Sequence, residues 1–492
     1  MKIYCFIISL LVTTYCLQAQ TTLNVGPGRT YANPVTAAAA AKPGDTILIH
    51  PANYRGPFFI SNLKGRRDAF IFIKGTNRDQ VIFDGGSESL HFSDAEFIHI
   101  SNITVRGQTG NGMNIDDAGS LESPTKHVIL DNCVFRDMAA SGNNDLLKLS
   151  GLDSFIIRHC HFENGATGGS GIDMVGCHAG TIRNNRFIQL GSNSIQAKGA
   201  SSEIEILSNH FTNGGQRTLN LGGSTGSAFF RPAGANYEAR NILAAANIIE
   251  GSVTPVAFVG SRNVRFINNT IIRPERWILR ILQESSDTSF YLSSANNSFI
   301  NNIVVVNNSL STDVNIGPNT SPTTFKFSNN LWYHLDNANW RGPQLPVIET
   351  QGIVQMNPQF MNLLNGDYRL LSNSPAIGKG KLEINVKEDY SGKFYLNPPS
   401  IGAYEGGLAT STHQDKSNNV LIYPNPFDDV LHVQDILGTA HLQIYDLRGN
   451  LHFQTHLDSA SHVIDLENLC AGFYMLKLKF RDGEIIRKLV KY

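Results

Sequence analysis

An excess of arginine marks one stretch of the sequence as a place where chemistry could occur. Between Arg217 and Arg280 there are eight arginines, no lysine and three glutamates, so the stretch carries 8 − 3 = +5 in a chain whose net charge is −1. The planar guanidinium group suits carboxylate and sulfate groups. The stretch therefore predicts a site for an acidic polysaccharide, and we expect Arg231, Arg276 and Arg280 to bind it.

A row of polar residues crosses the same stretch. Triplets of apolar, polar and apolar residues repeat along the chain, and their alignment places these polar residues in one row: Lys148, Asp173, Gln196, Asn220 and Arg280. Because the apolar flanks of a strand point inward, the row points outward, and Lys198 lies two positions beyond Gln196 on the same face. Neighbouring strands are about 5 Å apart, so one sugar unit could span one strand. The row predicts a groove of sugar-binding subsites.

A recurring phrase predicts the elements that would position this row. It is an Asn, often preceded by a second Asn and followed two places later by an aromatic or β-branched residue, as in Asn184-Asn185-Arg-Phe187 and Ser208-Asn209-His-Phe211. Its intervals of 22 to 38 residues, without helical periodicity, indicate a solenoid of stacked turns. We expect a parallel β-helix with about three strands in each turn, in which the anchor Asn side chains form a buried hydrogen-bonded ladder. Cys133 and Cys160 replace Asn at two successive anchors and would be free or bridged thiols.

Four segments are expected. Residues 1–20 have the charge, apolar run and cleavage site of a secretory signal, residues 21–407 form the solenoid, 408–419 a polar linker, and 420–492 a small β-sandwich domain. The charge balance argues against nucleic acid as a partner, and after the signal no apolar run is long enough to span a bilayer. The chain is thus expected to be exported and all-β.

Both ends of the chain resemble known secreted proteins. A short helix expected at residues 31–41, before the strand Thr46-Ile47-Leu48-Ile49, resembles the N-terminal cap of right-handed β-helix proteins of the pectate-lyase kind. The series from Asn357 to Glu405 is similar to their C-terminal closure. The last seventy or so residues, with Pro424-Asn425-Pro426 and Gly472-Phe473-Tyr474, resemble the type A C-terminal sorting domain of the type IX secretion system. That resemblance implies transport by the type IX machinery, followed by release or surface attachment after the domain is cleaved.

A further resemblance concerns activity. The arrangement Lys198-Gly-Ala-Ser-Ser with Gly215-Gln216-Arg217 is similar to the chondroitinase B and alginate lyase family. The resemblance implies that Lys198 is a Brønsted base, that Arg217 assists as acid, and that calcium neutralises the uronate carboxylate. Asp145 and Asp173 are the candidates to hold calcium through oxygen ligands. The favoured function is β-elimination in a uronate-containing polysaccharide, with cations stabilising the charge that develops.

Two other functions remain open. A glycoside hydrolase needs two carboxylates flanking the glycosidic bond, for which Asp145, Asp173 and Glu250 are available. A glycan-binding or adhesin solenoid needs no base, and the aromatic residues Trp277, Phe229 and Phe230 would serve it equally well. In each case we expect residues 214–232, where the repeat is interrupted, to form a loop beside the site.

Overall fold

The computed structural model describes most of the chain. It covers residues 20–406 and, in the C-terminal part, residues 420–423, 425, 427, 429–434, 439–446, 449–458, 461–480 and 483–491. The expected signal at residues 1–20 falls, except for Gln20, outside the described residues, and so does the expected linker. The chain divides between residues 407 and 408 into two compact units.

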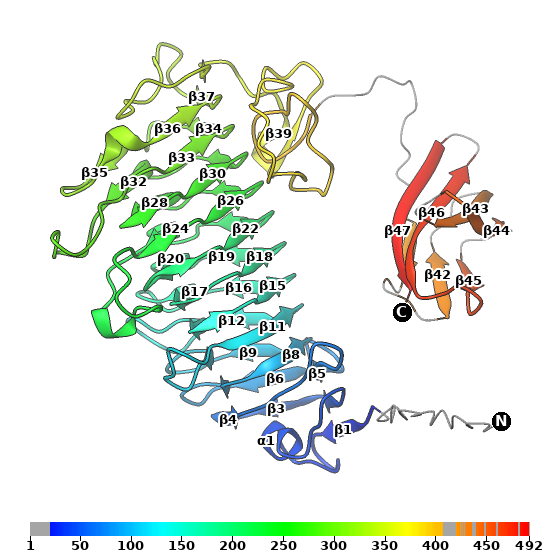
Figure 1. The fold of residues 1–492 in the computed structure, drawn as a ribbon. Coiled ribbons are helices and arrows are strands. Elements are labelled where there is room, and N and C mark those ends of the chain that lie inside the picture. The colour runs from blue at the N-terminus through cyan, green and yellow to red at the C-terminus, as the bar shows by residue number, and fades with distance from the viewer. Residues whose placement is uncertain are drawn as a thin grey trace, which may run out of the picture. The chain divides into compact units, whose positions relative to one another are not determined.

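The first unit is a parallel β-helix built from three long parallel sheets (Figure 1). Sheet I contains β1 (Thr22–Val25), β2 (Thr46–Ile49), β5 (Ile71–Gly75), β8 (Glu96–Ser101), β11 (Thr125–Asp131), β14 (Leu152–Asp153), β15 (Ile156–Arg158), β18 (Thr181–Arg183), β22 (Glu205–Leu207), β26 (Leu243–Ala245), β30 (Arg265–Ile267), β33 (Ser298–Ile300) and β36 (Lys326–Ser328). Sheet II contains β4 (Phe58–Ser61), β7 (Leu90–Ser93), β10 (Met113–Asp116), β13 (Leu147–Ser150), β17 (Ser170–Val175), β20 (Asn193–Lys198), β24 (Arg217–Gly222), β28 (Val256–Val259), β32 (Trp277–Leu282) and β35 (Thr312–Ile316). Sheet III contains β3 (Ala52–Tyr54), β6 (Val81–Asp84), β9 (Thr104–Arg106), β12 (Val134–Arg136), β16 (His161–Glu163), β19 (Arg186–Ile188), β23 (His210–Thr212), β27 (Ile248–Glu250), β31 (Thr270–Ile272), β34 (Ile303–Val306), β37 (Leu331–His334) and β38 (Ile353–Val354).

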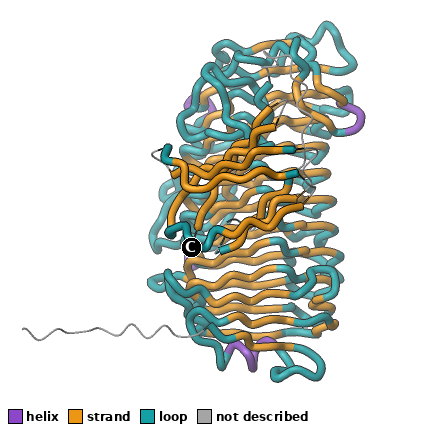
Figure 2. The backbone as a smooth tube through the Cα atoms, turned by 90° about the vertical axis from the view of Figure 1, so that its right-hand side faces the viewer, coloured by secondary structure: helices purple, strands orange, loops and turns teal. Residues whose placement is uncertain are grey.

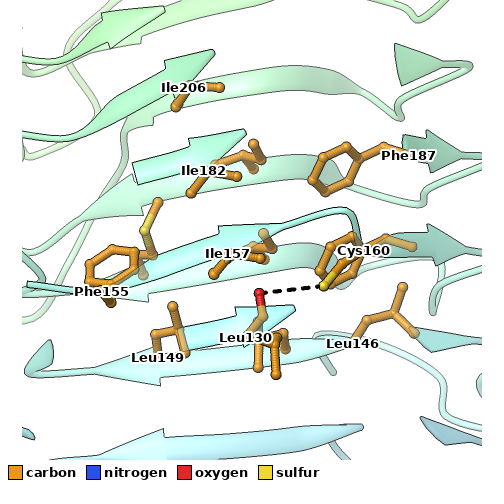
Figure 3. Close-up of a cluster of buried hydrophobic side chains, with 14 of the residues drawn as sticks. Leu130, Leu146, Leu149, Phe155, Ile157, Cys160, Ile182, Phe187 and Ile206 are labelled. Carbon is orange, nitrogen blue, oxygen red and sulfur yellow. Dashed lines mark hydrogen bonds between the residues drawn. The ribbon is translucent and has the colours of Figure 1, made fainter. Parts of the chain in front are cut away.

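Alternation of inward and outward side chains creates the core. In β13, Leu147 and Leu149 are buried whereas Lys148 and Ser150 are half-buried, so the strand faces the interior on one side only. Figure 3 shows how such inward residues from successive turns fill the space between the sheets. Stacking of similar turns therefore gives one continuous apolar core, and successive strands lie above one another (Figure 2).

The recurring phrase has a physical explanation. The second Asn forms the predicted ladder: the Oδ1 atom of Asn247 accepts from the backbone N of Asn209 at 2.9 Å, and its Nδ2 donates to the Oδ1 atom of Asn269 at 2.9 Å. The first Asn occupies the left-handed region, with φ of 56° at Asn184, a conformation that Asn tolerates better than most residues. The aromatic residue two places later stacks on its counterpart in the next turn. Phe187 and Phe211 have ring centroids 4.8 Å apart.

The two anchor cysteines are free thiols. Both are buried, and the backbone N of Cys133 donates to the Sγ atom of Cys160 at 3.4 Å, which continues the ladder with sulfur in place of the amide oxygen. The ladder ends at Glu349, whose Oε1 atom accepts from the backbone N of Asn330 at 3.0 Å. The small sulfur and the terminal carboxylate thus keep the polar column satisfied at both ends.

The helix predicted at the N-terminal end is present but shorter, and the predicted closing segment packs against the side of the β-helix. The helix α1 is shorter than expected, Pro34–Ala38, and it is capped by Asn33 and buries Ala37 and Ala38 against the first turn. The closing segment, which includes β39 (Phe360–Asn362) and β40 (Asp367–Leu370), packs on the outer face of sheet III, where Ala376, Ile401 and Ala403 are buried with Ile303 and Leu331.

The second unit contains two antiparallel sheets around a core of its own. One sheet contains β41 (Leu421–Tyr423), β42 (Val430–Gln434) and β45 (Ser461–Asp465), and the other β43 (Ala440–Asp446), β44 (Leu451–Leu457), β46 (Gly472–Phe480) and β47 (Gly483–Lys491). Buried residues from both sheets meet in one cluster, among them Leu431, Leu442 and Leu476. This is the small β-sandwich that the sequence predicts.

Candidate functional site

The predicted polar row exists on the outer face of sheet II. The strand register pairs Lys148 of β13 with Asp173 of β17, Asp173 with Gln196 of β20, and Gln196 with Asn220 of β24. The prediction was wrong at one point, because Ala257 of β28 lies between Asn220 and Arg280. Flanked by Val256 and Phe258, Ala257 belongs to a wholly apolar strand, which contains no triplet of apolar, polar and apolar residues.

The row is also longer than expected. It continues from Lys148 to Asn114 of β10, His91 of β7 and Phe59 of β4, and beyond Arg280 to Asn315 of β35. The triplet Leu-His-Phe in β7 has the same apolar, polar and apolar order, so the sequence contained a signal for this extension. Hydrogen bonds with Asp116 and Glu88 raise the pKa of His91 to about 9. The outer face of sheet II is therefore lined with polar groups over most of its length.

Two carboxylates and two ammonium groups meet at the centre of the row. Asp173 is buried and forms a close ion pair with Lys148, and the Nζ atom of Lys198 lies 3.2 Å from its other oxygen, outside hydrogen-bond geometry. Asp145 is also buried, with Oδ2 3.6 Å from the Nζ atom of Lys148. Burial and the neighbouring Asp173 raise the pKa of Asp145 to about 6, and Asp145 and Asp173 raise the pKa of Lys148 against the effect of its own burial.

This shift gives a prediction for stability. Because the folded pKa of Asp145 is raised above its ordinary value of 3.8, its contribution to folding stability is fully present below that value and is lost as the pH rises through about 6. The difference corresponds to about 3 kcal/mol. In Asp145→Asn, the amide oxygen can still accept from the backbone N of Ser170, which donates to Oδ1 at 2.8 Å in the native protein. As the pH rises from about 4 to about 7, the stability of the variant relative to the native protein should therefore increase by about 3 kcal/mol. The measurement is the free energy of unfolding of both proteins at each pH. Parallel pH profiles would contradict the assignment.

Lys198 and Arg217 converge on one pair of side chains. The Nζ atom of Lys198 donates to the Oε1 atom of Gln196 at 3.2 Å, and the Nη1 atom of Arg217 donates to the Oδ1 atom of Asn220 at 3.3 Å. Gln196 and Asn220 are direct neighbours in the register. Since Lys198 is at the end of β20 and Arg217 at the start of β24, the two cations reach the Gln196–Asn220 pair from opposite ends of the strands.

The interrupted repeat forms a loop beside Lys198, later in the chain than expected. Residues 217–222 belong to β24, and the insertion is residues 223–238, with one turn of 3-10 helix at Ser227–Phe229. The loop starts against the site: a Cβ atom on Gly223 would lie 3.0 Å from the Nε2 atom of Gln196 and 3.3 Å from the Cβ atom of Lys198. The backbone of the loop therefore packs closely against the side chains of Gln196 and Lys198.

Glu238, which the sequence analysis did not select, fixes this loop. It is buried and its carboxylate accepts from the backbone N of Gly199 at 3.0 Å, from the backbone N of Thr225 at 2.8 Å and from the hydroxyl of Ser285 at 3.0 Å. Gly199 follows Lys198 directly, so Glu238 connects the end of β20 to the inserted loop and to the segment after β32. No local pattern marks such a residue, because its partners come from distant turns.

The remaining predicted residues separate into two groups. Arg276 and Arg280 stack on Trp277, with guanidinium carbons 4.2 and 4.4 Å from the ring centroid, and Arg217 forms an ion pair with Glu284 at 2.6 Å. Arg231 does not join them. It is buried, pairs with Asp153, and donates from Nε to the carbonyl of Gly176 at 2.8 Å, so its guanidinium anchors the inserted loop to earlier turns.

The predicted carboxylates do not form a calcium site, and Glu250 lies apart from Asp145 and Asp173. Calcium takes six to eight oxygen ligands, whereas Asp145 and Asp173 face ammonium groups, and among the described residues there is no group of three or more His, Cys, Asp or Glu that could hold a metal ion. Glu250 is in β27 on sheet III, where it pairs with Arg273. Glu250 therefore does not flank one bond together with Asp145 or Asp173.

Known proteins support the architecture. Residues 88–271 match the family described as a right handed beta helix region, and residues 421–492 match the secretion system C-terminal sorting domain. No curated protein matches the chain. Among the described residues, no helix is long and apolar enough to cross a membrane.

The solved structures that align with this chain include three lyases. Pectate lyase Pel9A aligns at 16% identity over 80% of this chain and 98% of its own, with a TM-score of 0.51, which shows a shared fold. A rhamnogalacturonan lyase aligns at 13% identity over 76% of this chain and 99% of its own, with a TM-score of 0.45. An alginate lyase from Paenibacillus sp. str. FPU-7 aligns at 14% identity over 68% and 99%, with a TM-score of 0.39. The chain is a right-handed parallel β-helix protein with a C-terminal type IX secretion sorting domain, which directs it to the cell surface or the extracellular space.

Proposed function

We propose that the protein is a polysaccharide lyase that cleaves a uronate-containing acidic polysaccharide by β-elimination. The observation that carries the proposal is the convergence of Lys198 and Arg217 on the Gln196–Asn220 pair, on an outward face lined with polar groups. A base and a guanidinium on either side of one sugar position are what elimination requires. A pectate lyase shares the fold, but the proposal depends on the side chains of this chain.

In this mechanism, Lys198 removes the proton from C5 of the uronate. The electron pair forms the C4–C5 double bond, the bond between C4 and the glycosidic oxygen breaks, and the leaving oxygen takes up a proton with Arg217 assisting as donor. The positive groups at the site stabilise the charge that develops on the uronate carboxylate. Asp173 has its closer contact with Lys148, so Lys198 is the less tightly held of the two ammonium groups. Only the neutral form of Lys198 can act as base.

The other residues of the row would bind the sugars on either side. Lys148 and Gln196 are half-buried, whereas Asp173 and Asn220 are buried; Asp173 holds the ammonium group of Lys148, and Asn220 accepts from Arg217. Buried groups that orient exposed ones make a preorganised site. Calcium has no step in this mechanism, because the lysines and arginines supply the positive charge.

A second candidate function is glycan binding without catalysis. The length of the row favours it, because polar groups extend along sheet II from His91 to Asn315, far beyond the reach of one base. A binder of this kind would retain the saccharide through many weak contacts and release it unchanged.

One assay separates these functions. The full-length protein would be incubated with alginate, pectate, chondroitin and heparin, with and without calcium, while ultraviolet absorbance follows the unsaturated product and a second assay follows new reducing ends. We expect both signals to rise together on at least one uronate. Reducing ends without absorbance would indicate hydrolysis, and saccharide binding without either signal would indicate a binding protein.

A further inference from the structure

Two arginines lie over the ring of one tryptophan at the start of β32. The guanidinium carbons of Arg276 and Arg280 lie 4.2 and 4.4 Å from the ring centroid of Trp277. Stacking on an aromatic ring fixes the plane of a guanidinium and leaves the N–H groups at its edge free to bind an anion bidentately. Trp277 and Arg280 are half-buried and Arg276 is exposed, so both guanidinium groups lie at the surface of the protein.

Positive charge is in excess at this place. Three arginines lie in this region: Arg217, Arg276 and Arg280. Of the described residues, the only carboxylate in an ion pair with any of them is Glu284, which pairs with Arg217. The Nε atom of Arg280 donates to the neutral Oδ1 atom of Asn315 at 2.9 Å, and Arg276 is in no ion pair within the described part of the chain. Burial lowers the pKa of Arg280, and the charges of Arg217 and Arg276 lower it further, whereas the charge of Glu284 raises it.

The position of the pair relative to the base follows from the register. Asn220 pairs with Ala257, and Ala257 pairs with Arg280, so Arg280 is two strands beyond Asn220 and three strands beyond β20, which carries Lys198. At about 4.8 Å between strands, Arg280 is about 10 Å from Asn220. A saccharide that advances by one unit per strand would thus bring its second unit, counted from the reacting position, to the arginine pair.

We propose that Arg276 and Arg280, stacked on Trp277, form an anion subsite that binds a carboxylate or sulfate group carried two units from the reacting sugar. The direction along sheet II rests on the proposed function, but the subsite itself requires only that the protein binds an anionic saccharide. It would make affinity depend on charge at a sugar that takes no part in the reaction. Two carboxylates would oppose such an anion: Glu284, which pairs with Arg217, and the exposed Glu275, which precedes Arg276 in the chain.

The test measures binding in the absence of turnover. In the full-length Lys198→Ala protein, calorimetry would give the affinity for hexasaccharides of alginate, pectate and chondroitin sulfate, for sulfated maltohexaose, and for neutral maltohexaose. Adding Arg276→Gln and Arg280→Gln should weaken binding of the best anionic hexasaccharide by about 10- to 100-fold, because hydrogen bonds to charged groups are lost, and should reduce the salt dependence of the affinity. Adding Glu284→Gln instead should strengthen binding.

Arg240 provides a matched control. It is exposed and its guanidinium carbon lies 4.4 Å from the ring centroid of Tyr237, but it is in β25 (Ala239–Arg240), which pairs with β21 (Ser201–Ser202) and β29 (Ser261–Arg262) outside sheet II. Arg240→Gln should leave the affinity unchanged. Carboxylated and sulfated ligands that both lose affinity would identify the shared chemistry, and loss for one class alone would identify the source of the anion.

The proposal would be overturned if adding Arg276→Gln and Arg280→Gln to the Lys198→Ala protein left its affinity unchanged, or if no anionic hexasaccharide bound. Failure of β-elimination would have a different signature. A protein that binds these ligands through Arg276 and Arg280 and yet forms no unsaturated product with Lys198 intact would retain the subsite and lose the lyase function.

Discussion

Replacing Lys198 with alanine should lower the rate of unsaturated product formation by about 10³-fold, because positioned general bases contribute roughly 10²- to 10⁴-fold. The affinity for substrate should change little. Lys198 provides one donor to Gln196 and one contact with Asp173, and Asp173 keeps its ion pair with Lys148 when Lys198 is removed. The fold should therefore persist, and kcat rather than KM should carry the effect. Initial rates over a range of substrate concentrations separate the two constants.

Two further variants make the result specific. Lys198→Arg retains the positive charge but cannot become neutral near pH 7, so it should be as inactive as the alanine variant if Lys198 is the base. Lys74→Ala removes an exposed lysine from β5 on sheet I and should leave the rate unchanged. A Lys198→Arg protein with normal turnover would show that this position supplies only charge, and a Lys198→Ala protein with normal turnover would remove it from the mechanism.

The sequence allowed the fold and the centre of the row to be predicted for the same reason. A solenoid repeats one backbone conformation, so a residue type required once per turn is visible as a period in the chain. Asn209 and Asn247 show the period because each must satisfy the bend of its neighbour, and Lys148, Asp173 and Gln196 follow in register once the period is known.

What the sequence could not predict depends on contacts between distant turns. Arg231 pairs with Asp153, 78 residues earlier, and Arg217 pairs with Glu284, 67 residues later. No periodicity links such partners, because they come from loops whose paths are set by packing. Arg231 therefore looked like a ligand-binding residue and is an anchor for the inserted loop, whereas Glu238, at the centre of that loop's hydrogen bonds, was not recognised.

Replacing Asn247 with alanine should destabilise the β-helix by about 3 to 6 kcal/mol. Its Oδ1 atom accepts from both the backbone N and the Nδ2 of Asn209, at 2.9 and 3.1 Å, and its Nδ2 donates to the carbonyl of Ile206 at 2.8 Å and to Asn269. Alanine would leave several of these buried groups without partners, each at a cost of about 1 to 3 kcal/mol. Relaxation and water entry would recover part of that cost.

Tryptophan fluorescence during denaturant unfolding measures this effect within the β-helix alone, because all three tryptophans of the chain, Trp277, Trp332 and Trp340, belong to the first unit. The control is Asn53→Ala in β3, where the side chain is exposed and a change within about 0.5 kcal/mol is expected. If Asn247→Ala lost less than about 1 kcal/mol, the ladder would contribute no more than a single ordinary hydrogen bond. The repeated Asn would then reflect the bend geometry of each turn, and not the cooperative column of amides that joins one turn to the next.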